Sequence, residues 1–403
     1  MKLPLVAAVL MLTAPAVAGA QVLGGLGRQA TPEQDGPIQQ SQPQQAAWQE
    51  WVKPGMKATW YTSSATLPGA LQTLEPDENG RWVNKQTGQR YGMQDRPGGS
   101  SSGFEELLVS TVSPGRVVMS QRTLQHVPIS GPGVITSVPA KAVVAGPQTV
   151  TEYWLPPAVI AGLEGIGHAS RTVSRFPFEM NGRTYNAVRI SDTGPNMRAW
   201  RTYDADSGLL LQLSLSNTMS GRAGAPGPDG RPTATDGDTM LINVQLVGLR
   251  QTSVPGPGTL APASLGQITG AAVTLIDTFA MGEFGANPPV TQQFQAQVRF
   301  EADLLTLVVN GQQSQAPAGG MYLDPQLLAR LQPGQTLDED PITGMTVRVA
   351  NAGNGLVVIE EINPLERTQN AYDAQSGLCV QQVRTSNAGG SATTTKDIRV
   401  QYR

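Results

Sequence analysis

The chain has 403 residues, a formal net charge of −3, and charged side chains at only 15% of its positions. This length exceeds that at which one hydrophobic core usually stops growing, so two domains are expected. The small net charge lacks the basic excess typical of proteins that bind nucleic acid or anionic membranes. We therefore expect no nucleic-acid partner.

Residues 1–20 have the pattern of a secretory signal peptide, with Lys2, an apolar run ending near Leu12, and small residues before a cleavage point after Ala20. The apolar run is too short for a helix that crosses a bilayer, and no later segment is long and apolar enough to do so. The chain contains no Asn-x-Ser/Thr sequon, which favours a bacterial export route. We expect a periplasmic or secreted protein that does not span the membrane.

Composition then divides the chain. Residues 21–47 are rich in Gln, Pro and Gly and predict a disordered leader. Residues 253–266 have the Pro/Gly/Ser composition of a linker. The expected domains are therefore a first β-rich unit at 48–252 and a second at 267–403.

Three landmarks recur in the same order in both units, which indicates an internal duplication. The segment "WLPPAVIAGL" (154–163) matches "YLDPQLLARL" (322–331), and each predicts a short amphipathic helix, with Asp324 as an N-cap. The octapeptide "YDADSGLL" (203–210) returns as "YDAQSGLC" (372–379). Finally, "INVQL" (242–246) matches "IRVQY" (398–402). The Gly/Pro-rich residues 220–238 are extra in the first unit, so we expect a surface loop inside a hairpin there.

The remaining pattern predicts antiparallel strands. Residues 294–300 alternate apolar and polar side chains, and residues 105–124 form two β-branched runs around Ser113-Pro114-Gly115. Asn-Gly pairs within 77–83 and 346–362 favour tight turns. The expected fold is mainly β, with two related antiparallel sheet units, each carrying one short α-helix, arranged as half-barrels or sandwiches.

The octapeptides themselves predict turns, because Asp accepts backbone N–H bonds at a turn and Gly adopts positive φ. The expected turn residues are Tyr203, Asp204, Gly208, Tyr372, Asp373 and Gly377. Asp204 and Asp206 resemble the start of a calcium loop, but the later bidentate carboxylate is missing and Asp206 becomes Gln375 in the second copy. We expect no metal and no cofactor at this motif.

The sequence has few of the residue patterns that are typical of catalytic sites. The chain has two histidines, His126 and His168, and one cysteine, Cys379, which we expect to be a small buried side chain. These residues do not match a zinc-binding spacing, and no phosphate-binding loop occurs. The acidic stretch 337–341 is expected to be a solvated turn. We predict no catalytic residue, although paired carboxylates remain an alternative.

All six tryptophans lie between residues 48 and 200. Aromatic side chains on a sheet face suit hydrophobic ligands, so Trp60, Trp82, Trp154 and Tyr322 are candidate ligand-binding residues, with core packing as the alternative. The expected function is that of an exported, non-enzymatic protein that binds an envelope protein or a hydrophobic small ligand. The alternatives are a periplasmic carrier of lipid or lipoprotein with a concave apolar sheet and a hydrolase that uses paired carboxylates.

Overall fold

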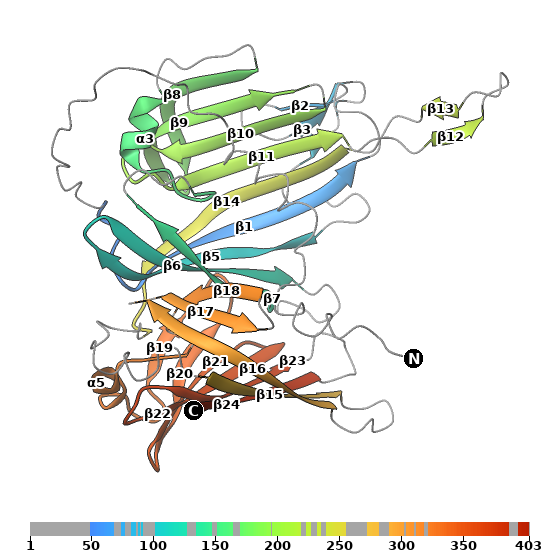
Figure 1. The fold of residues 1–403 in the computed structure, drawn as a ribbon. Helices are drawn as coiled ribbons and strands as arrows, with labels where there is room; N and C mark the ends of the chain where they lie inside the picture. Colours follow the sequence, from blue (N-terminus) through green and yellow to red (C-terminus); the bar gives the residue numbers. More distant parts are fainter. Residues whose placement is uncertain are drawn as a thin grey trace, which may run out of the picture.

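Figure 1 shows the protein as a computed structural model, which is mainly β. The residues described are 49–67, 74–76, 82–85, 88, 90–91, 101–126, 134–146, 151–163, 170–194, 196–218, 223–226, 232–234, 239–254, 272–281, 290–301, 304–309, 312–317, 321–386 and 394–402. The expected signal peptide, the expected leader, His168 and the Asn-Gly pair of 77–83 lie outside them.

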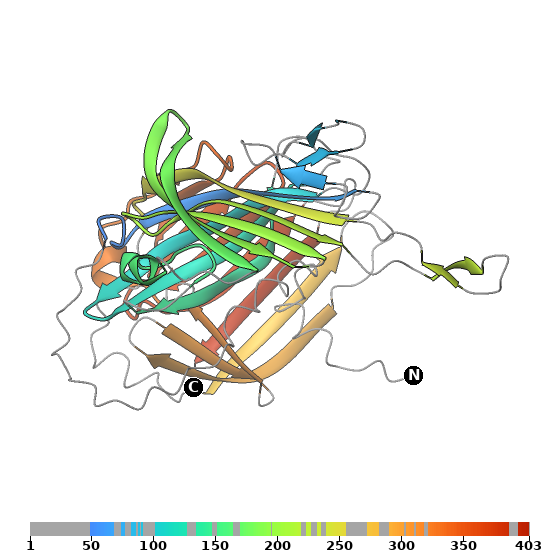
Figure 2. The same cartoon turned by 90° about the horizontal axis from the view of Figure 1, so that it is seen from above.

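The first sheet has nine antiparallel strands in the order β7-β6-β5-β1-β14-β11-β10-β9-β8. Its strands are β1 (Met56–Leu67), β5 (Ser101–Ser113), β6 (Arg116–His126), β7 (Val134–Ala145), β8 (Arg171–Met180), β9 (Arg183–Thr193), β10 (Met197–Asp204), β11 (Leu210–Thr218) and β14 (Thr239–Gln251). The hairpin of β8 and β9, green in Figure 2, curves out of this sheet.

The second sheet has ten strands in the order β18-β17-β16-β15-β24-β23-β22-β21-β20-β19. Its strands are β15 (Ala272–Met281), β16 (Val290–Glu301), β17 (Leu304–Val309), β18 (Gln312–Pro317), β19 (Thr336–Glu339), β20 (Thr346–Gly353), β21 (Leu356–Ile362), β22 (Glu366–Asp373), β23 (Cys379–Ser386) and β24 (Thr394–Tyr402). Apart from β19, every strand has a counterpart at the same place in the first sheet.

This shared strand order confirms two related antiparallel units. The short helices α3 (Pro157–Gly162) and α5 (Pro325–Leu328) occupy equivalent places in the chain, after β7 and after β18. Asp324 caps α5, because its carboxylate accepts a hydrogen bond from the N–H of Gln326 at 2.8 Å. Within the part of the chain that the structure describes, no helix has the length and apolar character of a membrane span.

Two small additions decorate the first sheet. One is a three-stranded sheet of β2 (Leu74–Pro76), β3 (Trp82–Asn84) and β4 (Arg90–Tyr91). The other is a ribbon of β12 (Ala223–Pro226) and β13 (Pro232–Ala234), which projects from the body in Figure 1. This ribbon falls inside the expected loop 220–238, between the paired strands β11 and β14, so the insertion carries its own short hairpin.

The expected hairpins form for local reasons. Strands β5 and β6 join at Ser113–Arg116, where Gly115 has φ +76°. Asn354 and Gly355 both have positive φ, at 53° and 78°, and join β20 to β21. The equivalent hairpin of the first unit, β8–β9, uses Asn181 and Gly182 in the same conformation. This fourth pair of matching residues supports the duplication.

Each unit has its own apolar core. The core of the first includes Trp60, Trp154 and Leu211, all fully buried. The core of the second includes Leu328 and Val349. A small third cluster joins the units, because Phe104 and Leu124 of the first sheet pack with Met345 from the second unit. The two sheets also approach each other at β7 and β18 (Figure 1).

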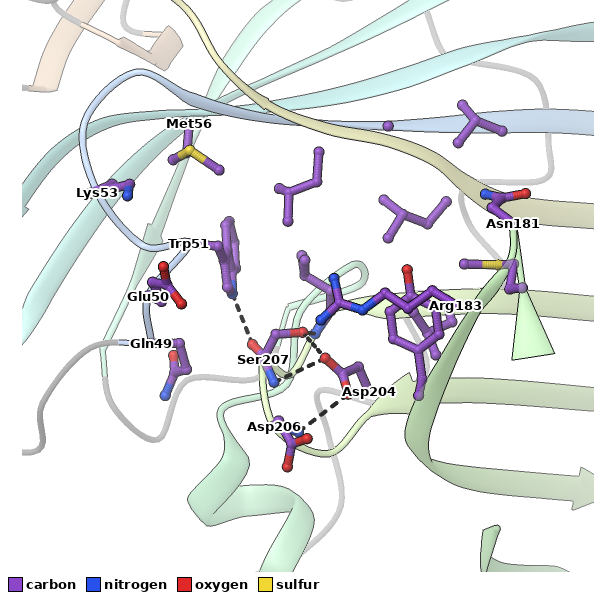
Figure 3. Close-up of a pocket in the computed structure, with 18 residues that line it drawn as sticks. Gln49, Glu50, Trp51, Lys53, Met56, Asn181, Arg183, Asp204, Asp206 and Ser207 are labelled. Carbon is purple, nitrogen blue, oxygen red and sulfur yellow. Dashed lines mark hydrogen bonds between the residues drawn. The ribbon is translucent and has the colours of Figure 1, made fainter. Parts of the chain in front are cut away.

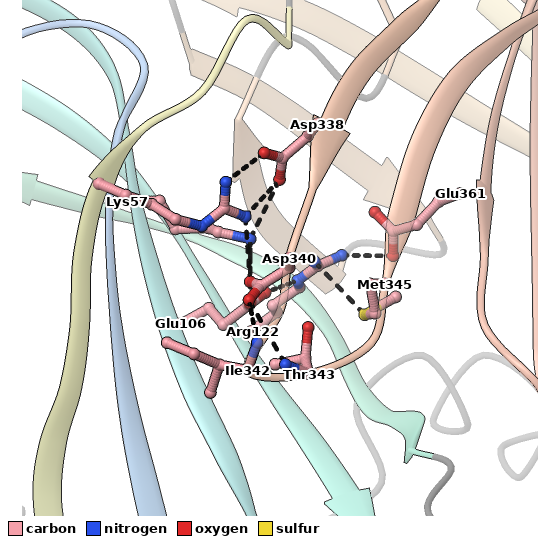
Figure 4. A network of polar contacts seen from close by, with 10 residues as sticks. Lys57, Glu106, Arg122, Asp338, Asp340, Ile342, Thr343, Met345 and Glu361 are labelled. Carbon is pink, nitrogen blue, oxygen red and sulfur yellow. Dashed lines mark hydrogen bonds and ion pairs between the residues drawn. The ribbon is translucent and has the colours of Figure 1, made fainter.

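A buried network of charges lies beside this third cluster and bridges the units (Figure 4). At its centre, the Nζ of Lys57 in β1 lies 2.6 Å from Asp340 Oδ2, 3.2 Å from Asp338 Oδ2 and 3.2 Å from Glu106 Oε1. Arg250 contacts both aspartates, with Nη2 at 2.7 Å from Asp338 Oδ2 and 3.1 Å from Asp340 Oδ2. The first unit thus supplies cations to two carboxylates of the second.

Arg122 of β6 extends the network. Its guanidinium pairs with Glu106 and, at 2.5 Å from Nη1 to Oε1, with Glu361 of β21. Burial acts to raise the pKa of the Asp340 carboxyl, but the charge and hydrogen bond of Lys57, with hydrogen bonds from the N–H of Ile342 and from Arg250, hold it well below its ordinary value.

The expectation of a solvated acidic turn at 337–341 is therefore wrong for two of its acids. Asp338 is 8% exposed and Asp340 is 1% exposed, whereas Glu339 faces solvent. The physical reason is that the first unit covers this segment and provides the cations that buried carboxylates require.

Candidate functional site

The turn between β10 and β11 anchors the segment that enters α3. The Asp204 carboxylate accepts hydrogen bonds from the N–H and the hydroxyl of Ser207, at 3.2 and 2.5 Å. Gly208 has φ +76°, and its carbonyl accepts a hydrogen bond from the N–H of Leu155 at 2.9 Å. A Cβ at Gly208 would lie 2.0 Å from the Leu155 carbonyl oxygen, so only glycine permits this approach.

The second copy repeats the geometry. Asp373 accepts from the N–H and hydroxyl of Ser376, both at 2.7 Å, and Gly377 has φ +77°. The carbonyl of Gly377 accepts a hydrogen bond from the N–H of Leu323 at 2.9 Å. The recurring octapeptide is thus a turn that also binds the chain before each helix, a contact that the sequence does not reveal.

A cavity of about 540 Å³ lies against this turn in the first unit (Figure 3). Four segments surround it: residues 49–56, which lead into β1, the tip of the β8–β9 hairpin, the turn itself, and the end of β14. The indole N–H of Trp51 donates to the carbonyl of Ser207 at 2.8 Å and joins the first of these segments to the turn. Trp51 also packs edge-on against Trp154, with ring centroids 5.7 Å apart.

The cavity has an apolar floor and a charged mouth. Its floor is formed by buried side chains, namely Met180, Leu209, Leu211 and Leu246. At the mouth stand exposed polar side chains, namely Glu50, Lys53, Asn181, Arg183 and Asp206. Arg183 lies over the ring of Tyr185, 4.9 Å from its centroid, and Figure 3 shows it reaching toward Ser207. Such a lining suits a ligand with both apolar and charged parts.

Two of the charges at this mouth, Arg183 and Asp206, are specific to the first copy. Because Asn181-Gly182 and Asn354-Gly355 are equivalent turns, Arg183 corresponds to Leu356. Asp206 corresponds to Gln375 in the matching octapeptide. The groups that build the turn are shared by both copies, whereas these two charged groups are not.

The candidate aromatic residues occupy other positions. Trp60 and Trp154 are fully buried, and Tyr322 is 2% exposed. The indole N–H of Trp60 donates to the carbonyl of Leu210 at 2.7 Å, and that of Trp154 donates to Ser207 at 3.2 Å. Burial favours the core-packing alternative for these three residues. Trp82 lies in β3, and its side chain is outside what the structure describes.

His126 and Cys379, the candidate base and nucleophile among the described residues, make contacts within the fold. His126 ends β6, and its Nδ1 lies 3.0 Å from the Oγ of Ser102 on the neighbouring strand, with Phe104 packed against the ring. Cys379 is buried, and burial raises the pKa of its thiol to about 12, so the reactive thiolate is disfavoured. Within the described ranges, no three His, Cys, Asp or Glu side chains gather as a metal site would require.

Glu105 of β5 is a titratable group separate from the cavity. Burial raises the pKa of its carboxyl to about 7, although hydrogen bonds from Thr123 and Gln121 act in the opposite direction. The nearby charge of Glu152 raises this pKa further, and that of Lys141 lowers it.

No protein-family model and no curated protein matches this chain. Among solved structures, a β-barrel-like protein of the domain of unknown function DUF1849 from Brucella abortus is 8% identical, with 87% of this chain and 99% of that chain covered and a TM-score of 0.15. A double mutant of transferrin-binding protein B from Haemophilus parasuis is 7% identical, with coverages of 86% and 75% and a TM-score of 0.15. Similarities this weak carry no argument about function.

Proposed function

We propose that this chain is an exported, non-enzymatic binding protein that holds a small ligand in the cavity of its first unit. The carrying observation is the cavity of about 540 Å³, whose size and mixture of apolar floor and polar mouth suit a small molecule. The second unit supports the first through the buried charge network. Export rests on the signal-peptide pattern of residues 1–20.

The chemistry of the described side chains supports binding over catalysis. Asp204, the most buried acid of the cavity, is held by Ser207 in the turn, and the Cys379 thiol is buried with a raised pKa. These groups act in the fold, which leaves the cavity with charges that recognise a ligand.

Filling the cavity tests this proposal. Leu249 lines the cavity and is 40% exposed, so Leu249→Trp places a large ring at the mouth without removing core contacts. Val144 on β7 is 39% exposed and is not among the lining residues, so Val144→Trp is the matched control. Each protein is exported from a bacterial host, purified without detergent and examined by native mass spectrometry and by thermal-shift screening of small molecules.

We expect the wild type and Val144→Trp to share a bound mass or a stabilising compound that Leu249→Trp has lost. The same compound retained by Leu249→Trp would contradict the cavity as the site, and turnover of that compound would favour the paired-carboxylate hydrolase. A bound lipid would favour the carrier. Intact mass of the periplasmic protein checks cleavage after Ala20.

A further inference from the structure

We propose that the ligand is a zwitterion with an apolar part, the apolar part lying on the apolar floor and the two opposite charges at the mouth. This inference rests on the proposed function, since it names the chemistry that the same cavity recognises.

The charged side chains at the mouth of the cavity are not paired with one another. Among the described residues, Lys53 and Arg183 make no ion pair, and neither does Glu50. Asp206 accepts only a long hydrogen bond, 3.4 Å from Asn186 Nδ2. Two cations and two carboxylates therefore stand around one apolar floor with their charges available to a ligand.

The mouth carries charges of both signs, and a complementary ligand must match both. Lys53 and Arg183 would attract a simple anion, but Glu50 and Asp206 would repel it. For a simple cation, the two carboxylates would attract and the two cations would repel. A ligand with both charges matches both sets. Arg183 is also preorganised, because the Tyr185 ring supports its guanidinium at 4.9 Å. Figure 3 shows Arg183 on one side of the cavity and Glu50 and Lys53 on the other.

The two copies of the repeat differ at two of these charged positions. The second unit keeps the Asp–Ser–Gly turn but has Leu356 and Gln375 where the first has Arg183 and Asp206. The fold thus tolerates uncharged side chains at these two places. The charged pair therefore serves something other than the turn, and the cavity lies beside it.

Isothermal titration calorimetry with probes that share an eight-carbon chain separates the ligand classes. The probes are octylphosphocholine, octanoate, octyltrimethylammonium and octyl glucoside, each below its micelle-forming concentration, and the dipeptide Leu-Leu is a zwitterion that is not lipid-like. We expect a zwitterion to bind at least tenfold more tightly than the anionic, cationic and neutral probes. Tighter binding of octylphosphocholine indicates a lipid headgroup as the source, and tighter binding of Leu-Leu indicates a peptide.

The variants Arg183→Leu and Asp206→Gln copy the residues of the second unit. Each is expected to weaken zwitterion binding by roughly two- to fivefold, the range for one exposed charge pair, and to leave octyl glucoside unchanged. Arg330→Leu, an exposed arginine just after α5, is the matched control and should bind as the wild type does.

If the protein prefers octyl glucoside or octanoate and Leu249→Trp abolishes that binding, the zwitterion proposal is overturned. The cavity would then still be a binding site. Binding of no probe at all would also overturn the zwitterion proposal, and the proposed function would then stand or fall on the native mass spectra. Zwitterion binding unaffected by Arg183→Leu and Asp206→Gln would equally refute the assignment.

Discussion

Replacing Lys57 with Met should strongly destabilise the contact between the two units. Met keeps most of the length and apolar character of the Lys stem, so the change removes mainly the charge. The Nζ of Lys57 contacts three carboxylates whose side chains are no more than 6% exposed. Asp340, which is fully shielded, would keep Arg250 at 3.1 Å and the N–H of Ile342 at 2.9 Å.

The contacts that Asp340 keeps determine how much free energy of unfolding the Lys57→Met variant should lose. Breaking a buried ion pair by removing one partner typically costs about 3–5 kcal/mol. Because Arg250 still neutralises part of the charge on Asp338 and Asp340, we expect the lower end, about 3 kcal/mol. The double variant Lys57→Met/Asp340→Asn removes both members of the closest pair and should recover part of this loss, as coupled partners do.

Urea unfolding is the appropriate assay, since urea does not screen charges as guanidinium chloride would. Tryptophan fluorescence reports on the first unit, because all six tryptophans lie between residues 48 and 200, whereas far-UV circular dichroism reports on both sheets. We expect the two signals to change together in the wild type and to separate in Lys57→Met. Lys53→Met, at an exposed site, is the control and should cost less than about 0.5 kcal/mol. A loss below about 1 kcal/mol for Lys57→Met would refute the role given to the network.

Substitution of two turn glycines and titration of two buried carboxyl groups test the structure further. Gly208→Ala should lower the free energy of unfolding by about 3 kcal/mol or more, because a Cβ would strike the Leu155 carbonyl. Gly182 also has positive φ, +74°, but open space surrounds it, so Gly182→Ala should cost only about 1 kcal/mol of backbone strain. Equal losses for the two variants in thermal melts would contradict the clash. Folding lowers the pKa of Asp340 below the ordinary aspartate value of 3.8, so the ionised carboxylate contributes its full stabilisation above pH 3.8. This contribution is lost as the pH falls below 3.8. A urea midpoint that stays constant from pH 5 to pH 2 would count against the buried network. The raised pKa of Glu105, about 7 against 4.5, means that the folded state holds a proton the unfolded state has lost, so its contribution falls as the pH rises from 4.5 through 7. Glu105→Gln should therefore gain about 1–3 kcal/mol over the wild type at pH 8 and almost nothing at pH 4.5, and an equal effect at both pH values would rule this out.

The features predicted correctly from sequence depend on neighbours along the chain. Positive φ at Asn354-Gly355 and the capping hydrogen bond of Asp324 involve residues within a few positions of each other, so residue type is enough to indicate them. The duplication was also readable, because landmarks matched in the same order predict two related units, and the two sheets share their strand order.

The errors and omissions involve residues far apart in the chain. Asp338 looked like part of a solvated turn because its partner, Lys57, lies 281 positions away. The cavity went unseen for the same reason, since it joins residues 49–56 to a hairpin tip and a turn more than a hundred positions later. Aromatic composition alone could not separate an exposed Trp60 from a buried one.

The sequence by itself therefore determined the class of fold, the repeat, its turns and the pattern of an export signal, because each depends on local backbone preference or on periodicity. Only the tertiary structure decided which charges are buried and which stand at a cavity. The cost of burying Asp340 and the availability of Arg183 are set by the groups that surround them in space. The first octapeptide illustrates both kinds of information. The sequence is enough to identify Gly208 as a turn residue, whereas its close contact with Leu155 forms only when the strands are assembled.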